Sequence, residues 1–99
     1  MARYDVFRDP DGTGFVVDVQ SDIFDDYRTR VVIPLLPPEI APLAVPRLNP
    51  RFDIEGQSFT LHPHFVASVP SSALGRPITS LASEDYAIAG ALDLMLKGF

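Results

Sequence analysis

Hydrophobic and polar positions alternate in short runs along most of the chain. Residues Tyr4–Phe7 and Phe15–Gln20 alternate in the way of half-buried strands, and the segment Asp9–Gly14 between them is rich in turn-forming residues. The apolar run Val31–Leu36 predicts a central strand with a bulge or a strand end at Pro34, because proline donates no ladder hydrogen bond. This pattern predicts a hairpin that continues into a bent sheet.

A second hairpin is predicted further along the chain. Phe52–Ile54 and Gln57–Leu61 flank a Glu55-Gly56 turn, in which glycine adopts a positive φ at no steric cost. Phe65–Val69 predicts another short strand. The prolines between Pro37 and Pro50 exclude a helix or an inner strand, so we expect an irregular, partly edge-like connection there.

The spacing of apolar residues becomes helical near the C-terminus. Ser83 is the expected N-cap, and Glu84 and Asp85 place acids in the first turn, where the helix dipole favours them. One stripe of the helix is apolar: Ile88, Leu92, Met95, Leu96 and Phe99. A neighbouring face has small residues that allow close packing on a sheet: Ala87, Gly90, Ala91 and Leu94. The fold class is therefore mainly β, a strongly bent antiparallel sheet or small barrel, with one C-terminal α-helix.

The composition indicates one domain over residues 1–99 whose partner is a protein. The chain has 99 residues, of which 46% are hydrophobic. A domain of this size buries about two-thirds of its unfolded surface, so its core is modest and dimerisation would add stability. The absence of cysteine suits a cytoplasmic location. Arg3 interrupts any signal-peptide pattern and Pro34 breaks the longest apolar stretch, so we expect no membrane segment. A net charge of −5 opposes direct binding of nucleic acid.

The residue pattern offers no catalytic, metal or cofactor site. His62 and His64 flank Pro63, lack an evident third ligand, and are interpreted as surface loop histidines. Three nearby carboxylates are interpreted as solvated turn formers: Asp22, Asp25 and Asp26. No serine lies in a nucleophile elbow, and Arg47 and Arg51 are too few to mark a nucleic-acid surface. We therefore expect that the protein is not an enzyme and needs no cofactor.

Two bulky apolar residues, Ile23 and Phe24, adjoin a charged segment, Phe24–Arg30, that is expected to be a loop. Such a pair belongs either to the core or to an exposed interaction patch. The residue pattern alone favours the core.

Four stretches of the chain resemble the CcdB family, the toxin half of a bacterial toxin–antitoxin pair that poisons DNA gyrase. They are Phe15–Ile23, Val31–Leu35, Ala67–Pro70 and Asp93–Phe99. The resemblance implies an SH3-like bent sheet with a C-terminal helix, and a homodimer. It implies that the dimer inserts at the central cavity of the gyrase A subunit dimer and traps the enzyme on cleaved DNA, without catalysis by the toxin. It also implies a cognate antitoxin with a tail that folds on binding, and repression of the operon through DNA contacts made by the antitoxin.

The resemblance also implies a gyrase-binding surface at positions of this chain that match the family. Its residues are Ser21, Ile23 and Phe24 from the loop, with Asp93, Leu96, Lys97, Gly98 and Phe99 from the helix end. The apolar end of the chain is expected to act as the effector tip and to form one patch with the loop.

Two of these positions depart from the family. Gyrase-poisoning members have Trp at the position of Lys97 and Asn at the position of Asp93, and losing a central aromatic anchor typically costs about 2 kcal/mol of binding. Asp93 and Lys97 are four residues apart on a helix and are expected to pair. Four hypotheses stay open: a surface adapted to the gyrase of its own host, a homologue that binds only its antitoxin, a ribonuclease toxin on the same barrel, and a harmless adaptor.

Overall fold

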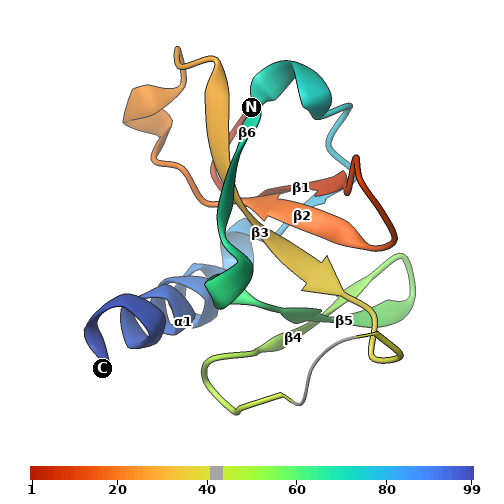
Figure 1. The fold of residues 1–99 in the computed structure, drawn as a ribbon, viewed down its shortest axis with the longest axis vertical. Coiled ribbons are helices and arrows are strands. Elements are labelled where there is room, and N and C mark those ends of the chain that lie inside the picture. Colours follow the sequence, from red (N-terminus) through yellow and green to blue (C-terminus); the bar gives the residue numbers. More distant parts are fainter. Residues whose placement is uncertain (41–43) are drawn as a thin grey trace.

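The computed structural model describes residues 1–40 and 44–99, and within them it shows a bent antiparallel sheet with one C-terminal helix (Figure 1). The strands are β1 (Asp5–Arg8), β2 (Phe15–Asp18), β3 (Thr29–Leu36), β4 (Arg51–Ile54), β5 (Gln57–Leu61), β6 (Ala67–Pro70) and β7 (Thr79–Ser80). Short 3₁₀ turns are η1 (Asp22–Phe24), η2 (Pro63–Phe65), η3 (Ser71–Ala73) and η4 (Ala82–Glu84), and the helix is α1 (Asp85–Lys97). The predicted fold class is confirmed.

Strand β3 is the centre of the sheet, and Pro34 marks the point where it changes partner. The sheet order is β4-β5-β3-β2-β1-β7, and β6 pairs with β3 outside this path. One edge of β3 pairs with β6 over Thr29–Val32 and then with β5 from Leu35 onward. Pro34 has no N–H to offer at this crossing, while its carbonyl accepts a bond from the His62 N–H at 3.1 Å. Splitting one edge between two strands bends the sheet into a nearly closed barrel.

The core fills the concave side of the sheet, and α1 covers it. Ile33 is fully buried and Val19 nearly so, as expected for core positions, and Ile88 and Ala91 are the buried residues of the helix. The main cluster joins both hairpins to α1: Tyr4, Val6, Phe15, Val17, Val19, Ile33, Leu35, Phe52, Ile54, Phe59, Leu61, Leu81, Ile88 and Ala91. Burial of this apolar surface is the main term that stabilises the fold.

Both hairpins depend on residues with positive φ. Glu55 (φ 54°) and Gly56 (φ 79°) form the two-residue turn between β4 and β5, as the dipeptide predicts. In the β1–β2 connection Gly14 has φ +100°, and a Cβ there would lie 2.5 Å from the carbonyl oxygen of Leu35. Gly14 therefore lets this connection pack directly against the end of β3.

Several predicted details of the C-terminal half are wrong. The strand expected at Phe65–Val69 is present as β6, but it begins two residues later, because Phe65 closes the 3₁₀ turn η2 with a bond to the His62 carbonyl. Ser83 is not the N-cap; it lies inside η4, and α1 begins at Asp85 without a side-chain cap. The Asp85 carboxylate instead accepts a hydrogen bond from the Tyr4 hydroxyl, which ties the helix start to the sheet.

Two further predictions concern the apolar stripe of α1 and the proline-rich connection between β3 and β4. Leu96 and Phe99 of the expected apolar stripe are exposed, and so is Gly90, which touches no part of the sheet. The proline-rich connection is irregular where it is described, although Ala41, Pro42 and Leu43 lie outside the described residues. Among the described residues, no helix is long and apolar enough to cross a membrane.

Candidate functional site

The loop around η1 presents apolar side chains to solvent. Ile23 is 80% exposed, and Phe24 and Tyr27 are also exposed, with their ring centroids 5.3 Å apart. The core position that the residue pattern favours for Ile23 and Phe24 is wrong, because β2 ends at Asp18 and the chain leaves the barrel before η1. We call Ile23, Phe24 and Tyr27 the η1 tip. Tyr27 was not among the residues predicted for this surface, although an aromatic residue in a charged loop can indicate an exposed interaction patch.

Hydrogen bonds hold the η1 tip in one conformation. The Ser21 hydroxyl accepts from the Ile23 N–H at 3.3 Å, which begins the 3₁₀ turn. Gln20 bridges the loop: its amide nitrogen donates to the Phe24 carbonyl at 2.8 Å, and its amide oxygen accepts from the Val31 N–H at 3.0 Å. A loop braced in this way would lose less entropy on binding a partner.

A buried ion pair anchors this loop to the barrel. The Arg30 guanidinium contacts the Asp18 carboxylate through Nε at 2.8 Å and Nη2 at 2.6 Å, and both side chains are fully buried. Arg30 Nη1 also donates to Asp25, in the loop, at 3.1 Å. Burial raises the pKa of Asp18, while bonds from the Gln20 N–H and Arg30 oppose that rise. Asp22 likewise accepts from the Arg3 N–H. The interpretation of Asp22, Asp25 and Asp26 as exposed loop residues is confirmed.

The end of α1 presents a second apolar surface, which we call the α1 end: Leu96, Lys97, Gly98 and Phe99. Leu96 is 73% exposed and Phe99 is 78% exposed. Gly98 has φ +84°, and its N–H donates to the Leu94 carbonyl at 3.0 Å, so it ends the helix in the left-handed conformation. Lys97 Nζ lies 3.4 Å from the Asp93 carboxylate, which confirms the expected pairing of these two residues.

The η1 tip and the α1 end lie apart within one chain. In Figure 1 the orange η1 loop is at the upper left of the molecule, and the blue C-terminal end of α1 is at the lower left, beyond η2. The expectation that Ile23 and Phe24 adjoin the C-terminus as one patch is therefore wrong for a single chain. Each surface stands on its own.

The two histidines differ in their surroundings. His64 is exposed as expected, but His62 is 1% exposed, so its interpretation as a surface residue is wrong. The His62 N–H donates to the Pro34 carbonyl, which extends the β3–β5 ladder by one residue. The imidazole ring is therefore buried, and its Nδ1 lies 3.4 Å from the Asn49 amide nitrogen. Burial, with a smaller contribution from His64, lowers the pKa of His62. The described residues contain no group of three metal-ligating side chains.

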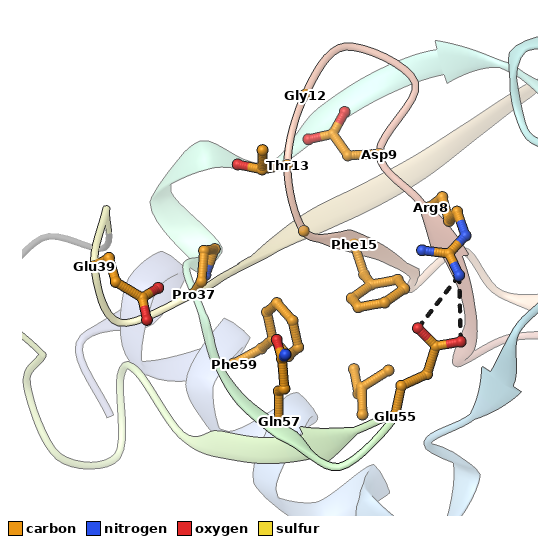
Figure 2. A pocket seen from close by; sticks show the side chains of 12 residues that line it. Arg8, Asp9, Gly12, Thr13, Phe15, Pro37, Glu39, Glu55, Gln57 and Phe59 are labelled. Atoms are coloured by element: carbon orange, nitrogen blue, oxygen red, sulfur yellow. Dashed lines mark hydrogen bonds and ion pairs between the residues drawn. The ribbon is translucent and has the colours of Figure 1, made fainter.

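A cleft of about 540 Å³ lies between the two hairpins (Figure 2). Figure 2 shows Phe15 and Phe59 on its floor and charged side chains around its rim. Arg8 is the rim cation, and both oxygens of Glu55 hold it, at 3.2 and 3.3 Å.

The bent sheet with one C-terminal helix is a fold that solved structures share. The fold matches an endoribonuclease in complex with its cognate antitoxin from mycobacterial species, with a TM-score of 0.79 at 14% identity, covering 97% of this chain and 94% of that one. It also matches the Mycobacterium tuberculosis toxin MazF-mt6, with a TM-score of 0.70 at 18% identity over 90% of each chain. A third match is MazE-MazF from Deinococcus radiodurans, with a TM-score of 0.71 at 10% identity, covering 98% of this chain and 95% of that one. At these identities the likeness concerns the fold.

The sequence itself matches the family model described as CcdB protein over residues 3–98. The chain therefore belongs to the CcdB family, and membership implies the toxin of a toxin–antitoxin system.

Proposed function

We propose that this protein is a toxin that binds the A subunit of DNA gyrase and traps the complex of gyrase with cleaved DNA. The observation that carries the proposal is the exposure of Leu96 and Phe99 at the end of a helix that is anchored in the core by Ile88 and Ala91. Apolar side chains held by a rigid helix suit the centre of a protein interface.

Lys97 is compatible with such a surface. Its ammonium group pairs with Asp93 on the same helix, and both side chains remain more than half exposed. The aliphatic stem of Lys97 is then free to cover apolar surface while the charge stays in solvent. We therefore expect the gyrase surface to accommodate Lys97, paired with Asp93, at the position where gyrase-poisoning family members have Trp.

The proposal includes a homodimer and a cognate antitoxin. In a homodimer, the two copies together would present two η1 tips and two α1 ends to gyrase. The antitoxin neutralises the toxin through a segment that folds on binding, and the toxin–antitoxin complex represses its own operon through the antitoxin's DNA contacts.

Calorimetric titration of the protein with the gyrase A subunit tests this proposal. Leu96→Ala and Phe99→Ala are expected to weaken binding at least about tenfold each, because each removes a large apolar contact. The matched control is Tyr86→Ala, since Tyr86 is 93% exposed near the start of the same helix. Equal affinity of all four proteins would refute the assignment of the α1 end, and no binding by the wild type would refute the gyrase target.

A ribonuclease activity is the second candidate, because the fold matches an endoribonuclease over 97% of the chain. Incubation with a mixed-sequence RNA, followed by gel analysis, separates the two. Specific cleavage that persists in the Leu96→Ala variant would favour the ribonuclease. Intact RNA together with binding to gyrase supports the first proposal.

A further inference from the structure

The side chain of Asn49 fastens the proline-rich connection between β3 and β4 to the end of β5. Its Oδ1 atom accepts from the Val45 N–H at 2.8 Å, and its Nδ2 atom donates to the Leu61 carbonyl at 3.0 Å. These two backbone groups fix the orientation of the amide, because a flipped amide would place oxygen against oxygen and nitrogen against nitrogen. We call residues 45–49 the connection turn.

The orientation of Asn49 also assigns the proton on the buried ring of His62. One N–H of the Asn49 amide is used by Leu61, which leaves the other for His62 Nδ1, 3.4 Å from Asn49 Nδ2. Nδ1 therefore accepts a hydrogen bond, and the neutral ring carries its proton on Nε2. Nε2 is itself buried, with no hydrogen-bond partner among the described residues.

A second proton on His62 would set two donors against each other. It would sit on Nδ1, which faces the N–H of Asn49. The ring would also become a buried cation, and the titratable group that acts on it is His64, with ring centroids 5.7 Å apart, which has the same sign when charged. The groups that the other packed elements contribute are uncharged: Pro34 on β3, Leu61 on β5, and Ile88 and Ala91, which α1 buries.

The connection turn is the element that can move in response. Arg47 has φ 71°, a left-handed conformation that residues other than glycine adopt at a cost in energy. Asn49 closes the turn, since its N–H also donates to the Val45 carbonyl at 2.8 Å. Arg47 lines a hollow of about 260 Å³ together with Ala87 and Gly90 of α1, so release of the turn removes one wall of this hollow.

We propose that His62 and Asn49 form a proton-operated latch, which fastens the connection turn to β5 while His62 is neutral and releases it when His62 is protonated. The rest of the barrel stays folded. A fall in pH then changes the surface beside α1 without unfolding the protein. The latch does not depend on gyrase binding, since no residue of the η1 tip or the α1 end takes part.

Amide hydrogen exchange measured by NMR tests the release, with rates corrected for the pH dependence of the chemical exchange step. The protection factor of the Val45 amide is expected to fall at least about fivefold from pH 7.5 to pH 5.5, because the released ring regains its ordinary pKa of 6.5. The Val19 amide, which donates to the Val31 carbonyl in the barrel, is expected to change less than about twofold. Equal falls at both amides, or no fall at Val45, would overturn the proposal.

Two variants assign the effect to one ring. His62→Gln keeps an oxygen that accepts from Asn49 but does not titrate, so protection of the Val45 amide is expected to be the same at both pH values. His64→Gln changes the exposed neighbour and is expected to keep most of the wild-type pH dependence. An unchanged pH dependence in His62→Gln, or its loss in His64→Gln, would contradict the latch.

The ring nitrogens of His62 test the latch without any substitution. Long-range ¹H–¹⁵N correlation spectra at pH 7.5 are expected to show an unprotonated Nδ1 and a protonated Nε2. A proton on Nδ1 at that pH would overturn the proposal, because Nδ1 could not then accept from Asn49.

Discussion

Replacing Arg30 with methionine tests whether the buried ion pair holds the η1 loop to the barrel. The substitution keeps an unbranched side chain but removes the guanidinium that contacts Asp18 and Asp25. Asp18 then remains buried without a cation. The Gln20 N–H, which donates to Asp18 at 2.9 Å, is its one remaining partner among the bonds described here.

The expected cost follows from the burial of the two groups. Breaking a fully buried pair by removing one partner costs about 3–5 kcal/mol, because the other charge is left uncompensated. For a domain of this size that loss lowers the melting temperature by at least about 12 °C. Asp25→Asn is the matched control: this carboxylate contacts the same guanidinium but is 51% exposed, so its loss is expected to cost less than about 1 kcal/mol.

The cost of Arg30→Met is expected to depend on pH. Without the guanidinium, the pKa of Asp18 in the folded protein rises further above its ordinary value of 3.8. When the pKa of Asp18 is higher in the folded than in the unfolded protein, proton binding stabilises the folded state at a pH below the unfolded pKa. This stabilisation is lost as the pH rises through the folded pKa. The variant is therefore least destabilised near pH 4 and most destabilised at neutral pH.

Urea unfolding at several pH values measures these effects. The double variant Asp18→Asn with Arg30→Met removes both charges and is expected to recover most of the stability lost at pH 7. If Arg30→Met at pH 7 costs no more than Asp25→Asn, the reasoning about the buried pair is refuted. An equal loss in the single and double variants would refute it as well.

Three further predictions concern the barrel. Gly14→Ala is expected to cost about 2–4 kcal/mol in urea unfolding, because its Cβ would lie 2.5 Å from the Leu35 oxygen, whereas Gly12→Ala, with no atom within 4 Å, should change stability little. Because burial lowers the pKa of His62 below 6.5, the unfolded state binds the proton better, and stability should fall as the pH drops below that value. His62→Gln should flatten this slope, while His64→Gln, which removes only the smaller cause of the lowered His62 pKa, should change it much less. Ile33→Asp should abolish the folded near-ultraviolet circular dichroism signal, since it buries an unpaired charge.

The hairpins and the helix could be predicted because their determinants are local. The Glu55-Gly56 turn, the alternation of β1 and β2 and the apolar spacing of α1 each reside in a few consecutive residues. The start of the helix was missed because the Asp85 carboxylate bonds to Tyr4, from the other end of the sequence. The run Ser83–Asp85 resembles the start of a capped helix. No local sequence pattern reveals that the Asp85 carboxylate binds a hydroxyl from a distant part of the chain.

The candidate site could be predicted in part. The Asp93–Lys97 pair matches the sequence analysis, because helix geometry alone fixes it. The exposure of Leu96 and Phe99 was expected from the resemblance to the CcdB family, whereas their helical spacing placed them on the same stripe as the buried Ile88. The burial of His62 and of Arg30 could not be foreseen, since each depends on where a strand crosses β3. The cleft between the two hairpins also escaped prediction because its lining comes from three separated segments.

A gyrase cleavage assay tests the central claim most directly. Purified gyrase, supercoiled plasmid and ATP are incubated with this protein, and the DNA is analysed after protein digestion. The account predicts that linear DNA accumulates with the wild-type protein and does not accumulate with a variant that lacks residues 97–99. Absence of linear DNA with a folded wild-type protein would contradict gyrase poisoning, and equal linear DNA with both proteins would contradict the role of the α1 end.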